Sequence, residues 1–413
     1  MNRVLMIAYH FPPLAGSSGI QRTLRFVQQL PAFGWEPIVL TASPRAYERT
    51  SADLLHEVPS GVHVERAFAL DAARHFSIGG RYPGALARPD RWISWRFAAA
   101  VAGRRLVREY EPQAIWSTFP IATAHVIAGA LQRKTQLPWV ADFRDPMAQD
   151  GYPADPRVWR SFRKTEEATV RHARFSVFTA PGAARRYQER YPAMAERIVV
   201  IENGFDEESF AGTDAARDPL NPGALTLLHS GIVYSWERDP TSLFAALQRM
   251  AAGGRLRAGE FKVRFRASSN DEQLAALAVQ HGVKDFVQLL PPIPYRAALD
   301  EMVRADALLV LQAANCNEQI PAKLYEYMRA GRPILALTDP AGDTAVTLRS
   351  AGVQAVARLD CVDEIVDLLG RFADGDFGSS GAIPDSAFVA GASRMKRSQS
   401  LATLLDIASR APR

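Results

Sequence analysis

Short apolar runs alternate with longer amphipathic segments along the whole chain. The apolar runs, of which Ala114–Thr118 is typical, are flanked by polar residues, glycine or proline, and they predict buried strands. The segments between them repeat apolar residues three and four positions apart, which predicts helices. Strands that alternate with helices in this way indicate parallel βαβ units with right-handed crossovers.

The first half of the chain contains one such series. Its expected strands are Val4–Phe11, Pro37–Thr41, Ala114–Thr118, Trp139–Phe143, Ser176–Thr179 and Ile198–Glu202. Its expected helices are Ile20–Leu30, Ser94–Tyr110, Ile121–Lys134, Val158–His172 and Gly182–Arg190. A polar stretch, residues 206–223, follows this series and ends in Asn-Pro-Gly, so it predicts a linker between domains.

The second half restarts the same alternation. Its expected strands are Leu225–Ser230, Lys262–Ala267, Phe286–Leu290, Ala307–Gln312 and Pro333–Thr338. Its expected helices are Thr241–Ala251, Asp271–His281, Arg296–Arg304, Pro321–Ala330 and Val362–Phe372. We therefore expect an α/β protein with two Rossmann-like, doubly wound parallel-sheet domains, residues 1–205 and 206–389, that face each other across a cleft. A last helical segment in residues 390–413 is expected to pack back on the first domain. Ligands of such sheets bind beyond the carboxyl ends of the strands.

Composition narrows the class of protein. The chain has 413 residues, of which 47% are hydrophobic and 23% charged, as in a globular protein with two or more domains. No apolar run is long enough for a membrane span, and the N-terminus has no signal-peptide pattern. The two cysteines, Cys316 and Cys361, indicate neither a disulfide framework nor a cysteine zinc site. We expect a cytoplasmic protein.

The positive charge is concentrated in the first half. Residues 1–210 contain 27 Lys and Arg against 21 Asp and Glu, whereas the remainder contains 22 against 23. Residues 74–108 contain eight arginines and one acid, Asp90, together with Trp92, Trp95 and Phe97. Such a surface attracts phosphate groups, either of a soluble ligand or of anionic lipid at the inner face of the cell membrane. The alternative is a solvated helical face without a ligand.

Two glutamates stand eight positions apart in the stretch NEQIPAKLYEYMRAGRPILAL. The apolar spacing of Leu324 and Tyr327 predicts a helix over Pro321–Ala330, so Glu318 lies in the loop before the helix and Glu326 inside it. At such a corner the loop carboxylate and the amides of the helix N-terminus face the same crevice, which favours a phosphate. A partly buried Glu326 requires hydrogen-bond donors, and a pair of sugar hydroxyls would provide them.

At these residues the chain resembles the retaining glycosyltransferases of family 4, which have the GT-B fold and an E-x7-E motif. The segment MIAYHFPPLAGSSGIQRTLRFVQQLPAFGWEPIVLT is similar to the first strand, glycine loop, helix and second strand of that family. The segments WVADFRDP and IVVIENGFD resemble those of bacterial members that build polysaccharides, and LLHSGIVYSWERDP resembles the opening of the donor domain. The resemblance covers nearly the whole chain, with the segments in the family's order.

The resemblance implies a set of donor contacts. Glu326 would bind the ribose hydroxyls of a nucleotide-sugar donor, and Glu318 would contact the transferred sugar. The diphosphate would lie against the segment Gln319, Ile320, Pro321, Ala322 and Lys323. The family usually has a glycine after the first glutamate, where this chain has Ile320-Pro321. Because Pro321 lacks an amide donor, Lys323 or Arg238 is expected to carry more of the phosphate charge.

The second domain opens with further donor candidates. The family places a cation after the first strand of this domain, and Arg238 stands there, where it would neutralise the leaving diphosphate. The alternative for Arg238 is a surface ion pair with Glu237 or Asp239. Ser230 and Gly231 form the loop after the same strand and are expected to lie near the donor.

Glycines and an asparagine of the first domain are expected to line the same site. Gly16 and Gly19 follow the first strand, permit close backbone approach, and correspond to the family's loop over the donor phosphates or acceptor. A simple tight turn is the alternative. Asn203 closes the domain, either as a turn or, as in relatives, as part of the floor beneath the donor. No G-x-G-x-x-G follows any strand, which disfavours a dinucleotide-binding dehydrogenase.

Acceptor candidates lie at the ends of two strands. Strand alternation points Asp142 and Arg144 to the same side, so an ion pair between them is one expectation, and an acceptor contact of Arg144 or Asp145 is the other. The resemblance also implies a histidine near the donor sugar. His125 is the candidate, although it is a residue of the helix and Thr118 stands closer to the strand end.

The sequence therefore predicts a retaining, metal-independent glycosyltransferase that uses a nucleotide-diphosphate sugar, without a cofactor. Its acceptor is expected to be a lipid-linked or polysaccharide hydroxyl in the synthesis of exopolysaccharide or another cell-surface glycan. Two alternatives stay open: an isomerase similar to UDP-N-acetylglucosamine 2-epimerase, which needs further acid and base groups, and a non-catalytic nucleotide-sugar binder. No nucleic acid partner is expected.

Overall fold

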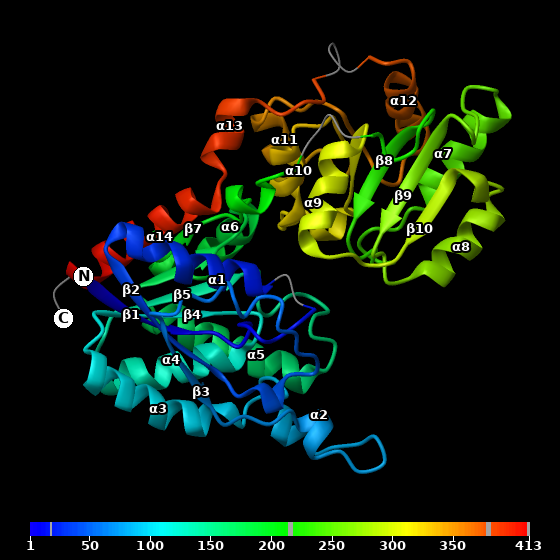
Figure 1. The fold of residues 1–413 in the computed structure, drawn as a ribbon. Coiled ribbons are helices and arrows are strands. Elements are labelled where there is room, and N and C mark those ends of the chain that lie inside the picture. Colours follow the sequence, from blue (N-terminus) through cyan, green and yellow to red (C-terminus); the bar gives the residue numbers. More distant parts are fainter. Residues whose placement is uncertain (17–18, 214–217, 377–380, 411–413) are drawn as a thin grey trace. The chain divides into compact units, whose positions relative to one another are not determined.

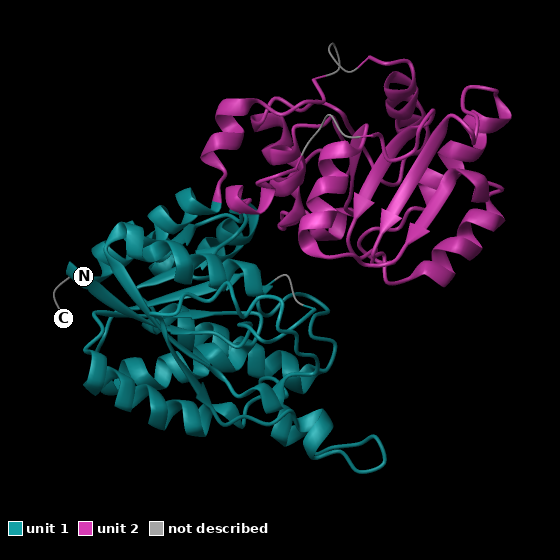
Figure 2. Cartoon of the chain, viewed as in Figure 1, with its two compact units in different colours: residues 1–203, 394–413 teal, residues 204–393 magenta. Residues whose placement is uncertain are grey.

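The computed structural model describes residues 1–16, 19–213, 218–376 and 381–410. It divides into two compact units, shown in Figure 2: unit 1 comprises Met1–Asn203 and Arg394–Arg413, and unit 2 comprises Gly204–Ser393. The chain therefore passes from one unit to the other twice. Part of the expected Gly16–Gly19 turn (17–18) and part of the expected linker (214–217) lie outside the described residues.

Unit 1 is built on a seven-stranded sheet in which every pairing is parallel (Figure 1). The strands are β1 (Asn2–Ile7), β2 (Trp35–Ala42), β3 (His63–Ala67), β4 (Ala114–Thr118), β5 (Trp139–Arg144), β6 (Phe175–Phe178) and β7 (Ile198–Val200). Their order is β3-β2-β1-β4-β5-β6-β7, so the strand order reverses between β1 and β4. At such a switch point, neighbouring crossovers diverge and leave a crevice at the carboxyl ends of the strands.

Helices cover both faces of this sheet, which buries the central strands on both sides. Figure 1 shows α3, α4 and α5 on one face and α1 and α14 on the other. The helices of the unit are α1 (Gly19–Gln29), α2 (Ala72–His75), α3 (Trp95–Tyr110), α4 (Ala122–Thr135), α5 (Pro156–His172), α6 (Pro181–Arg190) and α14 (Arg394–Arg410).

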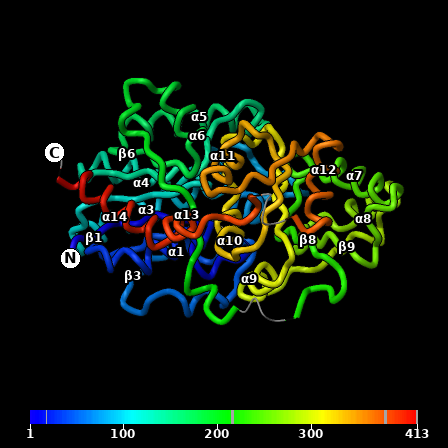
Figure 3. Tube along the Cα trace, turned by 90° about the horizontal axis from the view of Figure 1, so that it is seen from above, coloured from blue at the N-terminus to red at the C-terminus, as the bar shows by residue number. Residues whose placement is uncertain are grey.

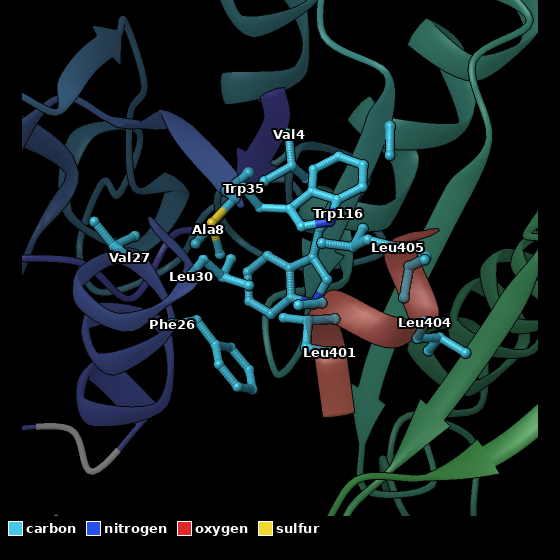
Figure 4. Close-up of a cluster of buried hydrophobic side chains, with 14 of the residues drawn as sticks. Val4, Ala8, Phe26, Val27, Leu30, Trp35, Trp116, Leu401, Leu404 and Leu405 are labelled. Carbon is cyan, nitrogen blue, oxygen red and sulfur yellow. The ribbon is translucent and has the colours of Figure 1, made fainter. Parts of the chain in front are cut away.

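The last helix belongs to the core of unit 1, although unit 2 separates it from the rest of the unit in the sequence. Leu401 and Leu405 of α14 are buried in one cluster with Phe26 of α1 and Trp116 of β4, and Figure 4 shows them pointing into it. The indole Nε1 of Trp35 donates a hydrogen bond of 2.9 Å to Asp406 of the same helix. Figure 3 shows α14 beside α1, which agrees with their contacts.

Unit 2 has a six-stranded parallel sheet of order β10-β9-β8-β11-β12-β13, with its switch point between β8 and β11. Its strands are β8 (Leu225–Ser230), β9 (Phe261–Arg266), β10 (Val287–Leu290), β11 (Ala307–Leu311), β12 (Ile334–Leu337) and β13 (Val356–Ala357). Its helices are α7 (Thr241–Ala252), α8 (Asp271–Gln280), α9 (Tyr295–Arg304), α10 (Lys323–Ala330), α11 (Asp343–Ser350), α12 (Val362–Ala373) and α13 (Ser386–Gly391).

The structure confirms the predicted α/β fold with two parallel sheets and corrects several of its elements. The first strand ends at Ile7 rather than Phe11, because residues 8–14 form turns even though Tyr9 and Phe11 are buried. Strand β3 was not predicted: the sequence HVERA is polar, and it forms a half-buried edge strand. Helix α11 was also not predicted, nor was strand β13, whose two residues are too short for a clear pattern.

Candidate functional site

The carboxyl ends of β8 and β11 form the centre of the candidate site in unit 2. Strand β8 ends at Ser230 and is followed by Gly231, whereas β11 ends at Leu311 and leads through a short 3-10 turn (Ala314–Cys316) to α10. Helix α10 begins at Lys323, two residues after Pro321, and its first turn contains Glu326. The predicted strand–loop–helix corner therefore lies at the topological switch point of the sheet, where open α/β sheets bind ligands.

The amine of Lys323 is fixed against the end of β8. Its Nζ lies 2.8 Å from Nε2 of His229 and donates a 3.0 Å hydrogen bond to the carbonyl oxygen of Ser230. His229 is fully buried, and its Nδ1 lies 3.0 Å from the carbonyl oxygen of Leu309 in β11. A side chain that sequence analysis assigned to phosphate binding is thus locked by a histidine for which the sequence suggested no such contact.

Burial and neighbouring cations control the charge of this pair. Burial is the main cause that lowers the pKa of Lys323 well below 10.5, and Arg238 acts in the same direction, whereas Glu326 opposes it. Burial also lowers the pKa of His229 well below 6.5, helped by the charges of Lys323 and Arg238. His229 is therefore a neutral hydrogen-bond acceptor for Lys323 near neutral pH.

Glu326 points from α10 toward the adjacent helix α9. The hydroxyl of Tyr295 donates a 2.6 Å hydrogen bond to Glu326 Oε1, and only 9% of the Glu326 side chain is exposed. The next residue, Tyr327, is fully buried, and its hydroxyl accepts a 2.8 Å hydrogen bond from the amide of Ser230. Burial raises the pKa of the Tyr327 hydroxyl above its ordinary value, so this hydroxyl stays neutral. The first turn of α10 is therefore bonded to both α9 and β8.

The loop that carries Glu318 is held by a buried glutamine. Gln312 Nε2 donates hydrogen bonds of 2.8 and 2.9 Å to the carbonyl oxygens of Cys316 and Gln319. The amide of Gln319 donates to the Cys316 carbonyl at 3.0 Å. Because Pro321 has no amide hydrogen and that of Gln319 is engaged, the predicted diphosphate segment retains the amides of Ile320, Ala322 and Lys323 only.

Arg238 lies after β8 without the ion pair that its sequence neighbours suggested. Its guanidinium donates a 2.5 Å hydrogen bond to the carbonyl oxygen of Ile232 and lies over the ring of Tyr234, 5.2 Å from the centroid. Asp239 accepts instead from the amide and hydroxyl of Thr241 at the start of α7. The positive charge of Arg238 thus stays at the edge of the candidate site.

A pocket of about 420 Å³ adjoins the Glu318 loop on the side of β12 and β13. Its lining residues are Asp239, Ser242, Gln312, Ala313, Ala314, Asp339, Arg358, Leu359 and Asp360. Three carboxylates and one guanidinium suit a ligand rich in hydroxyl groups better than a phosphate.

In unit 1, a buried ion pair occupies the carboxyl end of β5. Asp142 accepts hydrogen bonds of 3.0 and 2.9 Å from Nε and Nη2 of Arg22, and both side chains are buried. The hydroxyl of Thr118 donates to the same carboxylate at 2.9 Å. Arg22 also bonds the carbonyl oxygens of Ile201 and Glu202, at 2.9 and 3.0 Å. Sequence analysis missed Arg22, because it stands in a helix 120 positions before its partner.

Arg144 does not form the expected ion pair with Asp142. The β5–β6 register shifts between these two residues, and Arg144 has a positive φ of 64°, which ends their simple alternation. The Arg144 guanidinium instead donates hydrogen bonds of 3.1 Å to the carbonyl oxygens of Phe119 and Gly19. Burial and the nearby charge of Arg144 lower the pKa of His10, after β1, to about 3. Thr118, Arg144 and Gly19 are thus brought together near the switch point of unit 1.

His125 lies in the hydrophobic interior of unit 1. Its Nδ1 lies 2.8 Å from the hydroxyl of Ser117, which also accepts a 2.8 Å hydrogen bond from Trp139 Nε1. Its ring contacts Trp139 and Phe143, and burial lowers its pKa to about 3. A packing role accounts for these contacts, and the predicted acceptor role of His125 has no support in them.

Neither a metal cluster nor a membrane-spanning helix is found in the part of the chain that the structure describes. There, no group of three or more His, Cys, Asp and Glu side chains lies close enough together to hold a metal ion. No helix over the same residues is long and apolar enough to cross a membrane.

Most of unit 1 is similar to a known protein family. Residues 18–204 match the family model of the glycosyl transferase 4-like domain. The matched segment contains Arg22, Asp142 and Arg144, whereas Glu318 and Glu326 lie outside it. No curated protein gives a significant match to the chain.

Solved structures resemble the whole chain. A glycosyltransferase from Rickettsia africae is 11% identical with a TM-score of 0.69, and the match covers 100% of this chain and 99% of that one. HepE of Anabaena, solved with UDP and glucose, is 15% identical with a TM-score of 0.67 and a coverage of 98% and 100%. Sucrose-phosphate synthase from Thermosynechococcus elongatus is 13% identical with a TM-score of 0.66 and a coverage of 99% and 96%.

These likenesses establish the predicted two-domain, Rossmann-like GT-B fold. At such low identities they show the fold alone. Similarity to glycosyltransferases of family 4 is supported by the family match over residues 18–204.

Proposed function

We propose that this protein is a retaining, metal-independent glycosyltransferase that moves a sugar from a nucleotide-diphosphate sugar to an acceptor hydroxyl. The observation that carries the proposal is the α10 corner, where a fixed amine (Lys323) and a buried carboxylate (Glu326) lie one helical turn apart at the switch point of unit 2. An amine suits a diphosphate, and a carboxylate suits the two ribose hydroxyls. One nucleoside diphosphate satisfies both groups.

In this proposal the residues around the corner share the donor. Tyr295 orients the Glu326 carboxylate toward the ribose, and Glu318 in the preceding loop contacts the transferred sugar. The remaining amides of Ile320, Ala322 and Lys323, at the positive end of α10, face the diphosphate. Structures of Anabaena HepE contain UDP and UDP-glucose, which supports a uridine nucleotide as the first donor to test.

The chemistry requires stabilisation of charge on the leaving diphosphate. As the bond between the sugar and the phosphate breaks, the leaving oxygens gain negative charge, and they accept the proton of the acceptor hydroxyl on the same face of the sugar. Lys323 and Arg238 stabilise that charge. The same face of attack and departure retains the anomeric configuration. No metal is needed in this scheme, because Lys323, Arg238 and the dipole of α10 stabilise the negative charge of the leaving diphosphate.

The acceptor is proposed to be a lipid-linked or polysaccharide hydroxyl in the synthesis of a cell-surface glycan. Gly16, Gly19, Asn203, Thr118, Arg144 and Asp145 are the candidates for further contacts with substrates in unit 1. Of these, Arg144 supplies a cation that is held in place by two carbonyl oxygens, which suits a phosphate-bearing acceptor.

Peripheral membrane contact is part of the proposal. Trp95 is fully buried, and the half-buried Trp92 packs on Tyr9, so neither indole is an exposed side chain. Other apolar side chains are exposed nearby: Ile78 is 87% exposed at a two-glycine turn, and Phe97 of α3 is 65% exposed. Arg81 forms a β-bridge with Ile78, and the Arg96 guanidinium lies over the Phe97 ring, 4.5 Å from its centroid. Such a combination of exposed apolar side chains and cations binds anionic lipid.

Binding of donor sugars tests the catalytic proposal. UDP, GDP and ADP sugars are titrated by calorimetry, and donor hydrolysis and transfer are then followed for the sugar that binds. Glu326→Gln is expected to lose binding by roughly 10- to 100-fold, because it removes a charged acceptor of two hydrogen bonds. Glu272→Gln, at an exposed glutamate of α8, is the control and should bind as wild type. If the wild-type protein binds a donor but never hydrolyses or transfers it, the proposed transferase activity is refuted.

Co-sedimentation with vesicles tests the membrane contact. Vesicles with anionic lipid are expected to retain the protein at low salt and to release it at high salt, whereas neutral vesicles leave it in solution. Ile78→Ser should weaken retention, and Leu55→Ser, at another exposed apolar residue of unit 1, should not. Equal retention of both variants contradicts a contact through the Ile78 turn.

A further inference from the structure

The hydrogen-bond partners of His229 determine which of its two ring nitrogens carries a hydrogen and which accepts from Lys323. The carbonyl oxygen of Leu309 only accepts, so His229 Nδ1 carries a hydrogen and donates it at 3.0 Å. A neutral imidazole has one N–H, so Nε2 is the acceptor and Lys323 Nζ donates to it at 2.8 Å. β11 therefore sets the tautomer of His229, and the tautomer sets the direction of the amine.

Two hydrogens of the Lys323 amine are committed to protein acceptors. One is donated to His229 and the second to the carbonyl oxygen of Ser230 at 3.0 Å. Within the described residues the structure gives this amine no third hydrogen-bond partner. A protonated amine therefore has one N–H left for a ligand.

Gly231 keeps the space beside the amine open. Its φ is +113°, a backbone conformation that residues with side chains rarely adopt. A Cβ at this position would lie 3.7 Å from Lys323 Nζ and would occupy the approach of a ligand atom. The amide of Gly231 is bonded to the carbonyl oxygen of Arg266 at 2.8 Å, and that of Ser230 to Tyr327, so neither amide is offered to a phosphate. The Lys323 amine therefore offers an anion a donor that these two amides do not provide.

We propose that His229 is a positioning residue for donor binding: its neutral Nε2, oriented by the carbonyl of Leu309, holds the Lys323 amine beside Gly231 so that its third N–H meets one phosphate oxygen of the donor. This inference rests on the proposed function and adds the residue that prepares the phosphate contact. A free lysine loses rotamer freedom when it binds a ligand, whereas an amine that is already fixed has lost that freedom on folding.

The arrangement also couples binding to protonation. The charged and titratable groups that face the pair are Arg238 from the β8–α7 segment and Glu326 and Tyr327 from α10. The amine of the free protein loses its proton well below pH 10.5, and a phosphate oxygen favours the protonated form. Donor affinity is therefore constant below the pKa of Lys323 and falls above it, by up to about tenfold per pH unit.

The first experiment observes Lys323 without any donor. The chain has six lysines, Lys134, Lys164, Lys262, Lys284, Lys323 and Lys396, so protein labelled with 13C at lysine Cε gives six signals. The signal that disappears in Lys323→Arg is expected to titrate well below pH 10.5 in wild type. In His229→Phe the amine loses an acceptor of its charged form, so the signal should titrate at still lower pH. A Lys323 signal that titrates identically in wild type and His229→Phe overturns the inference.

The second experiment measures UDP affinity and the kinetic constants against pH. His229→Phe is expected to weaken UDP binding by about tenfold and to raise KM for the donor more than it lowers kcat. The reason is that the Lys323 amine is no longer held in the direction of the phosphate oxygen, which weakens its charge-assisted hydrogen bond. His229→Gln places an amide oxygen within reach of Lys323 and should restore most of the affinity. Rescue by glutamine distinguishes positioning from a merely structural role, in which both variants would lower stability but bind UDP as wild type does.

The two experiments separate this inference from the proposed function. If no nucleotide binds and the Lys323 signal still responds to His229→Phe, the proposed function fails, and with it the role of His229 in donor binding. If UDP binds and Lys323→Met weakens it but His229→Phe and His229→Gln do not, the proposed function stands and the positioning role is refuted.

Discussion

The ion pair between Arg22 and Asp142 should contribute strongly to the stability of unit 1. Asp142 is 0% exposed and accepts two hydrogen bonds from Arg22 and one from Thr118. Asp142→Asn keeps the size of the side chain but leaves the Arg22 guanidinium buried without its counter-charge. Two unit charges about 4 Å apart attract by about 4 kcal/mol at an effective dielectric constant of about 20. Loss of one partner of a buried pair costs about 3–5 kcal/mol.

In Asp142→Asn the carbonyl oxygens of Ile201 and Glu202 remain as hydrogen-bond acceptors for Arg22, and this reduces the loss of stability. We therefore expect Asp142→Asn to lower the free energy of unfolding by about 3 kcal/mol. For a unit of roughly 220 residues, this corresponds to a fall in the melting temperature of about 6–12 °C.

Tryptophan fluorescence reports this transition selectively. Six of the seven tryptophans belong to unit 1, and Trp236 of unit 2 is 66% exposed. Urea unfolding followed by fluorescence should show a lower midpoint with an unchanged slope. Glu167→Gln is the matched control, because Glu167 pairs with Arg171 at the surface and should contribute below about 1 kcal/mol. A loss in Asp142→Asn as small as in the control would refute the reasoning.

Three further expectations concern burial and backbone geometry. Leu405→Ala should lower the free energy of unfolding, measured in urea, by about 2–5 kcal/mol. Ile407→Ala, at a half-exposed residue of the same helix, should lower it far less, and equal losses would contradict the docking of α14. The pKa of His125 is about 3 in the folded protein, against 6.5 for a histidine in the unfolded chain. As the pH falls from 6.5 toward 3, the unfolded chain takes up a proton that the folded protein does not, so the free energy of unfolding falls by about 4–5 kcal/mol in all. His125→Phe should flatten this pH dependence of unfolding, and His172→Asn, at an exposed histidine, should leave it unchanged. Gly231→Ala should cost about 1–3 kcal/mol, because alanine is strained at a φ of +113°, and calorimetric melting of unit 2 checks it.

Most of the fold was predictable because its signals are local. The strand Ala114–Thr118 and the helix that ends at Arg304 carry their own apolar runs and stop residues, and the structure reproduces them. The edge strand β3 was missed because a half-buried strand at an edge has no continuous apolar run. The predicted corner around Glu318 and Glu326 was found because its spacing is also local.

Contacts between distant positions were not predictable from the pattern. Arg22 and Asp142 are 120 positions apart, and each alone is an ordinary charged residue. The expected pairing of Asp142 with Arg144 failed because a register shift interrupts the alternation of β5. His125 matched a motif only loosely, and the structure places its ring against Trp139 and Phe143 in the core.

The sequence by itself determined the elements, the two parallel-sheet domains and the residues of the α10 corner, since periodicity, turns and motif spacing act within a few residues of the chain. Only the tertiary structure decided which side chains those residues meet. It brings β8, β11 and α10 together at one switch point, so that the carbonyl of Leu309 orients His229 and His229 holds Lys323. The hydrogen bonds that set the charge and direction of that amine join residues 80 and 94 positions apart, and such contacts arise when the sheet assembles.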